Sequence, residues 1–61
     1  MTAKKIRKLR ARAGLTQARL AALLGLGAGG QVTVSRWEAG TQPITEPHAR
    51  LLEMVCRRAA Q

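Results

Sequence analysis

The sequence predicts an all-α fold, a compact bundle of four, at most five, short helices that forms a single domain over residues 1–61. Three observations lead to this prediction. The apolar residues are mainly Leu and Ala, with one Trp and no Phe or Tyr, a composition that favours helices over strands. Apolar side chains recur every three or four residues along several segments. Glycine and proline separate these segments, as expected at helix ends and turns.

The first two segments each begin at a threonine that can cap a helix. The first predicted helix runs from about Thr2 to Ala13, and Gly14 ends it. Its apolar stripe consists of Ile6, Leu9 and Ala13. The second predicted helix starts at Thr16 and runs through Leu24. Its apolar positions are Leu20, Leu23 and Leu24.

A glycine-rich turn leads into the third helix. Residues Gly25 to Gly30 are predicted to form a loop, because four of the six are glycine. This loop lacks the Gly-Lys-Ser/Thr of a P-loop and the preceding strand of a dinucleotide site, so no nucleotide cofactor is expected.

The third predicted helix spans residues 31–39 and has two different faces. Gly40 ends this helix, and Pro43 prevents its continuation. At 100° per residue, one face carries Val34, Trp37 and Glu38. The nearly opposite face carries Val32 and Arg36, flanked by Thr33 and Ser35. Trp37 is expected in the core rather than stacked on a base, since it shares a face with Val34.

The last predicted helix begins around Glu46-Pro47, with Thr45 or Glu46 as its cap. Its apolar face is expected to be Leu51, Leu52 and Val55, with Cys56 and Ala59 at the edges. Glu46–Arg50 and Glu53–Arg57 are stabilising i, i+4 pairs. His48 is expected to be exposed and without function. The only cysteine, Cys56, is expected to fill apolar space rather than to act as a redox switch.

Two charged residues are predicted to point inward. Arg10 lies about 40° from Ile6 on the helical wheel, and Glu38 shares a face with Trp37. An unpaired buried charge is very unfavourable, so the sequence favours an ion pair between Arg10 and Glu38. The alternative is that both lie at a solvated edge and contribute little.

The charge balance indicates an anionic partner. Eleven Lys and Arg residues face three acidic residues, for a net charge of +8 and a pI of about 11.8. Nucleic acid and a membrane surface both fit, and charge kept for solubility is a third interpretation. No apolar run is long enough to span a bilayer and no signal peptide precedes the domain, so a cytosolic protein is expected. One His and one Cys make neither a metal site nor a nucleophile–base pair, so no metal, cofactor, small-molecule substrate or enzyme activity is expected.

Three ordered motifs carry a family resemblance. They are G-L-T-Q at residues 14–17, L-A-A-L-L-G at 20–25 and T-V-S-R-W-E-A-G at 33–40. Together they resemble the phage repressor and Cro type (XRE-like) of helix-turn-helix DNA-binding domain, over about Ile6 to Val55. This chain differs in a turn about three residues longer, around Gly27-Ala28-Gly29, and in Ala39, where the family often has Asn.

The resemblance implies a site for double-stranded DNA. In that family the second helix crosses the DNA backbone and the third lies in the major groove. By position, the base-reading residues would be Gln31, Val32 and Arg36. The backbone contacts would be Thr16, Gln17, Thr33, Ser35, Thr41 and Gln42, with the amides of the loop from Gly40 to Gln42. Arg10 and Glu38 match the family's structural ion pair. The basic first helix, Lys5 included, and Arg19 are expected to attract phosphate without regard to sequence.

Several alternatives stay open at this stage. Gln31 could cap its own helix, Val32 could pack against the glycine turn, and Arg36 could be an ordinary solvated charge. The leading interpretation is a repressor or autorepressor that binds a near-palindromic operator as a homodimer, with Leu52, Cys56 and Ala59 as the dimer face. An antitoxin-type regulator with a protein partner and a cationic membrane-surface peptide are the alternatives.

Overall fold

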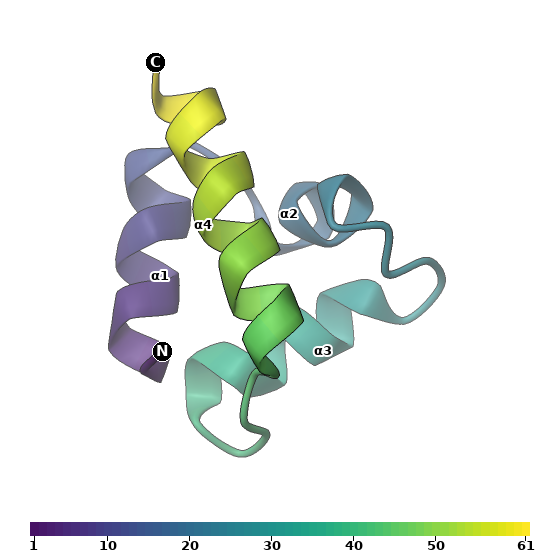
Figure 1. The fold of residues 1–61 in the computed structure, drawn as a ribbon. Helices are drawn as coiled ribbons and strands as arrows, with labels where there is room; N and C mark the ends of the chain where they lie inside the picture. Colours follow the sequence, from purple (N-terminus) through teal and green to yellow (C-terminus); the bar gives the residue numbers. More distant parts are fainter.

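The computed structural model describes all residues from Met1 to Gln61 and contains helices only. The four helices are α1 (Ala3–Arg12), α2 (Gln17–Leu23), α3 (Gly30–Ala39) and α4 (Glu46–Ala60). Figure 1 shows α4 lying across the front of the molecule, with α1 beside it, α2 on its other side and α3 below. The all-α prediction is confirmed, and there is no fifth helix.

Thr2, Thr16 and Thr45 all occupy the cap positions predicted for them, and two of the three make a capping hydrogen bond. The Thr2 hydroxyl accepts a hydrogen bond from the Lys5 amide at 3.1 Å, and the Thr16 hydroxyl accepts one from the Arg19 amide at 3.0 Å. Thr45 occupies the cap position of α4 but makes no such bond; its hydroxyl lies 2.9 Å from His48 Nδ1 instead. Helix α3 starts without any side-chain cap.

The turn between α2 and α3 depends on glycine at alternate positions. Gly25, Gly27 and Gly29 all adopt positive φ, between 70° and 81°, a region that other residues rarely enter. Gly30, which the sequence allows either at the end of the loop or at the start of the helix, is the first residue of α3. A Cβ atom there would lie 2.7 Å from the Leu26 Cβ and 3.0 Å from the Ala21 Cβ. Gly30 therefore allows α2 and α3 to approach closely.

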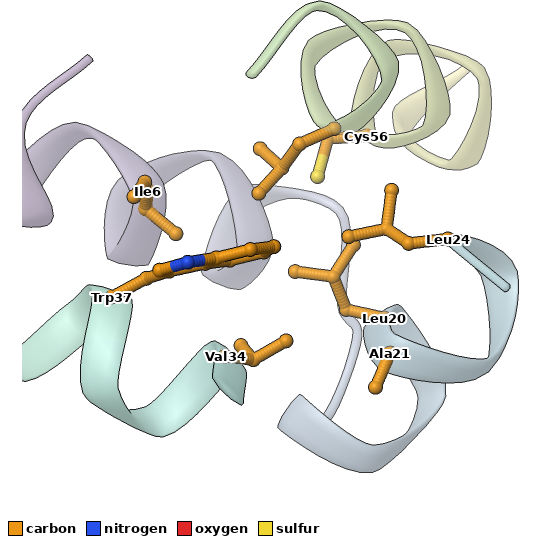
Figure 2. Close-up of a cluster of buried hydrophobic side chains, with 8 residues drawn as sticks. Ile6, Leu20, Ala21, Leu24, Val34, Trp37 and Cys56 are labelled. Carbon is orange, nitrogen blue, oxygen red and sulfur yellow. The ribbon is translucent and has the colours of Figure 1, made fainter. Parts of the chain in front are cut away.

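The core is built around Trp37. Figure 2 shows its indole ring between Ile6 of α1 and Val34 of α3, with Leu20, Leu24 and Cys56 grouped beyond one end of the ring. The core cluster consists of Ile6, Leu20, Ala21, Leu24, Val34, Trp37, Leu52 and Cys56. Trp37 is 3 % exposed, which confirms its predicted place in the core.

Three apolar residues face differently from the prediction. Leu23 is 42 % exposed, because α2 turns the smaller Ala21 toward Gly30 of α3. Leu51 is 37 % exposed, because α4 directs Ala49, Leu52 and Cys56 inward at i, i+3, i+7 spacing. Cys56, placed at an edge from the sequence, is fully buried.

Two further expectations for α4 are wrong. Leu52 and Cys56 are 0 % and 1 % exposed, so they belong to the monomer's own core and cannot form the predicted dimer face. His48 is half-buried rather than exposed: its ring packs against Trp37 with centroids 5.6 Å apart and the planes tilted by 44°.

Candidate nucleic-acid interface

The outer face of α3 presents the three predicted base-reading residues together. Gln31, Val32 and Arg36 are all exposed, and Ser35 is exposed between them. Val32 is 52 % exposed, so it does not pack against the glycine turn. Arg36 forms no salt bridge in the chain. Thr33 is half-buried, and its hydroxyl lies 3.5 Å from the Gly29 carbonyl oxygen, to which it donates.

The inner face of α3 is fixed by the Glu38 carboxylate, which is only 5 % exposed. Arg10 Nε donates to Glu38 Oε2 at 2.6 Å, and Arg10 Nη2 donates to Oε1 at 3.0 Å. The structure thus brings the predicted ion pair together in two-point geometry. Arg10 Nη1 also donates to the Leu15 carbonyl at 2.9 Å. The pair therefore joins α3 to α1 and to the segment that leads into α2.

The environment of Glu38 keeps it ionised. Burial by itself raises the pKa of this carboxyl group. The hydrogen bonds from Arg10 and Gln17, with the charges of Arg10 and Arg7, lower it by more, so the pKa lies below its ordinary value of 4.5. The same hydrogen bond raises the pKa of Arg10, so both partners stay charged at neutral pH.

Gln17 serves this internal network at the start of α2. Its side-chain Nε2 donates to Glu38 Oε1 at 3.3 Å, and the residue is half-buried. An amide nitrogen carries two hydrogens, so a second N–H remains for another acceptor. Thr16 and Arg19 beside it are exposed. The N-terminus of α2 therefore presents a free amide donor and a positive charge, and Gln17 joins it to α3 at Glu38.

The backbone amides of the loop after α3 form hydrogen bonds within the chain, whereas the family resemblance led us to expect them to hold a phosphate. The amides of Thr41 and Gln42 donate to the Arg36 carbonyl at 3.1 and 3.4 Å, and the Thr41 hydroxyl donates to the same oxygen at 3.4 Å. The Gly40 amide caps the helix by donating to the carbonyls of Arg36 and Trp37. These backbone groups close the end of α3, so they are not free to hold a phosphate. The half-buried Gln42 side chain remains.

The structure separates Lys5 from the other predicted site residues. Lys5 lines a surface hollow of about 510 Å³ that contains only residues of α1 and Thr2, and none of α2 or α3. Arg7, one of the basic residues of the first helix, has an effect that was not predicted: it is exposed, and its charge helps to lower the pKa of Glu38. Arg7 lies about 60° from Arg10 around α1, whereas Lys5 lies about 140° away. The angle to Arg10 was the available signal.

The structure contains neither a cluster of metal-ligating side chains nor a membrane-spanning helix. No three His, Cys, Asp or Glu side chains gather in a way that could hold a metal ion. None of the helices has the length and apolar character needed to cross a bilayer. Burial raises the pKa of the Cys56 thiol, which keeps it protonated and unreactive.

Comparison with known proteins agrees with this geometry. A family model described as helix-turn-helix matches residues 6–59, which extend from the first turn of α1 almost to the end of α4. No curated protein and no solved structure matches the chain significantly. The match covers most of the chain, and the chain belongs to the XRE-type helix-turn-helix family of DNA-binding transcription regulators.

Proposed function

We propose that this chain is a sequence-specific repressor or autorepressor of phage or mobile-element type that reads operator DNA with α3. One observation carries the proposal. Gln31, Val32 and Arg36 are exposed on one face of a helix whose opposite face is buried and tied to α1 by Arg10 and Glu38. A base-reading helix needs this combination, because its side chains must be free while its position is fixed.

The three side chains differ in the base edges they suit. Arg36 offers two parallel donors to O6 and N7 of guanine, and Gln31 can bond N6 and N7 of adenine. Val32 suits the methyl group of thymine. Each good two-point contact discriminates by about 1–3 kcal/mol against the wrong base. Two such contacts and one apolar contact read only a few base pairs.

The residues around this face suit the DNA backbone. Thr16, Gln17 and Arg19 lie at the N-terminus of α2, where the helix dipole favours a phosphate. Ser35 and Thr33 flank the reading side chains, and the Gln42 side chain lies just beyond the end of α3, next to Thr41, whose hydroxyl donates to the Arg36 carbonyl. Phosphate contacts of this kind set the register of the protein on the duplex but carry no sequence information.

The proposed binding unit is a homodimer on a near-palindromic operator. A monomer that reads a few base pairs gains useful affinity when two copies bind two half-sites. The apolar side chains that α4 leaves exposed, Leu51 at 37 % and Met54 at 52 %, are the surface that a second copy would cover. The same two residues favour the second candidate, an antitoxin-type regulator whose protein partner covers α4.

Selection of bound sequences from a random pool of duplex DNA tests the reading face. The wild-type chain should enrich one motif, and Arg36→Ala should lose the preference at one base position while remaining folded. Arg50→Ala is the matched control, because Arg50 is an exposed arginine on α4, and the enriched motif should be the wild-type one. If Arg36→Ala keeps the full motif, α3 is not the reading helix.

Sedimentation of the free and operator-bound chain tests the homodimer. A dimer on the operator that is weakened by Leu51→Ala and Met54→Ala supports the proposed unit. A monomer at micromolar concentration, both free and on DNA, would rule it out.

A further inference from the structure

Helix α1 is strongly basic and almost wholly unpaired. It contains six basic residues and no acidic residue. Only one of them, Arg10, has a carboxylate partner. Helix α4 differs, because its Glu46 pairs with Arg50 and its Glu53 pairs with Arg57. The charge of the molecule is therefore concentrated on one helix.

This arrangement works against the stability of α1. Lys4 and Lys5 lie in its first turn, where the helix dipole disfavours a positive charge and where α4 has Glu46. The pairs Lys4–Lys8 and Lys8–Arg12 are like charges at i, i+4, which destabilise a helix. No acidic residue in the chain pairs with them. Local electrostatics that oppose the fold are expected where they serve binding.

The unpaired charges share one surface. Lys4, Lys5, Lys8 and Arg12 line the hollow of about 510 Å³ together with Thr2 and Leu9. Around the axis of α1 these four lie about 120–160° from Arg10, which points at α3. Along the axis, Lys4, Lys8 and Arg12 follow one another at a rise of about 6 Å. A row of charges at regular spacing suits an extended polyanion better than one small anion.

We propose that this surface, Lys4, Lys5, Lys8 and Arg12, is a second binding site for the phosphate backbone of DNA, separate from the outer face of α3. The inference rests on the proposed function for its partner, DNA, but on none of the base-reading residues. A DNA strand offers one negative charge per 3.4 Å of its axis, so it can engage several of these cations at once. The backbone comes either from duplex that flanks the operator or from a second duplex.

The test compares two triple variants that remove the same charge. Lys4→Gln, Lys8→Gln and Arg12→Gln are combined in α1, and Arg50→Gln, Arg57→Gln and Arg58→Gln are combined in α4. Affinity for a long mixed-sequence duplex is measured against salt concentration. The α1 variant should lower the slope of log affinity against log salt by about 2–3, because each phosphate contact contributes about 0.9. The α4 variant should keep the wild-type slope. Equal slopes in all three proteins, or equal losses in both variants, would overturn the inference.

Two further measurements complete the test. The α1 variant should unfold at the same or a higher urea concentration than wild type, so its weaker binding is not a folding defect. If the backbone flanks the operator, the loss appears on an operator with long flanks and disappears on the operator alone. If it belongs to a second duplex, the wild type captures a free labelled duplex on an immobilised one and the α1 variant does not. If the α1 variant loses as much affinity on the short operator as on the long one, and the wild type captures no second duplex, the α1 surface is not a separate site.

The outcome is independent of the reading face. If the base preference survives in the α1 variant and its salt slope is unchanged, only the second surface is disproved. If the wild-type chain enriches no motif but the α1 variant has the lower salt slope, the second surface is supported and sequence-specific reading is disproved.

Discussion

At the scale of single residues, the stability of the reading helix depends on Glu38. A carboxylate that is 5 % exposed is tolerated only because Arg10 and Gln17 supply three donor contacts. Removing Arg10 would leave this charge buried with one weak partner. Arg10→Ala should therefore lower the free energy of unfolding by about 3–5 kcal/mol, measured by urea titration with the fluorescence of Trp37 as the probe. Arg57→Ala, which breaks the exposed pair with Glu53, is the control and should cost at most about 0.5 kcal/mol.

The same carboxylate makes stability depend on acid. The pKa of Glu38 is lowered in the folded chain, so the unfolded chain takes up a proton first. Its contribution is complete above the ordinary value of 4.5 and is lost as the pH falls through the lowered pKa. The melting temperature should fall over this acid range, and the fall should be much smaller in Glu38→Gln, which lacks this contribution at every pH. Parallel profiles for the two proteins would show that other groups control acid unfolding.

At the scale of elements, the contact between α2 and α3 depends on the missing side chain of Gly30. A methyl group there would meet the Cβ atoms of Leu26 and Ala21 at 2.7 and 3.0 Å, and neither can move without its backbone. Gly30→Ala should lower the free energy of unfolding by about 1–3 kcal/mol through overpacking, although alanine favours helices. It should also weaken operator binding by changing the angle between the two helices. Ser35→Ala, a substitution at an exposed position of the same helix, is the control. Its free energy of unfolding, measured by thermal unfolding, should lie within about 0.5 kcal/mol of the wild-type value.

The helix caps offer a matched pair of threonines. Thr16 accepts from the Arg19 amide, whereas Thr45 caps no backbone amide. Thr16→Ala should lower the free energy of unfolding by about 1 kcal/mol, and Thr45→Ala should lower it less. Chemical denaturation of both variants checks this order. The reverse order would mean that the contact of Thr45 with His48 matters more than the cap of α2.

At the scale of the whole molecule, a chain of 61 residues has little stability to lose, about 3–9 kcal/mol. Leu52 is 0 % exposed in its core. Leu52→Ala should cost about 2–5 kcal/mol and leave a measurable unfolded fraction by circular dichroism. Leu51→Ala, one residue earlier and 37 % exposed, should leave the fold intact. A fully folded Leu52→Ala chain would contradict the place of Leu52 in the monomer's core.

Sequence patterns predict this fold well where one residue decides the outcome. Glycine, proline and threonine mark the helix ends, and the helical wheel places Trp37 inside and Arg10 toward Glu38. The patterns fail where the outcome depends on how helices pack. Leu23 turns outward because α2 presents Ala21 to Gly30, a contact between elements that periodicity within α2 does not contain.

The residues of the candidate site also fall into two groups: those whose exposure is decided within their own helix, and those whose contacts depend on how the elements pack. The exposure of Gln31, Val32 and Arg36 follows from the opposite, apolar face of their own helix. The inward use of the Thr41 and Gln42 amides depends on how the chain leaves α3, which sequence spacing does not fix. The separation of Lys5 from α3 follows from the sequence instead: Lys5 lies about 140° from Arg10 around α1, and Arg10 faces Glu38 of α3.

The division of α3 into a buried and an exposed face has a consequence for evolution. The residues that stabilise the fold, Val34, Trp37 and Glu38, are not those proposed to choose the bases. Mutations at Gln31, Val32 and Arg36 are therefore nearly free of folding cost, and new operator preferences can arise by single steps without loss of the domain. A lineage of such chains can diversify its targets rapidly on one conserved scaffold, and the same property makes the domain a suitable starting point for engineered specificity.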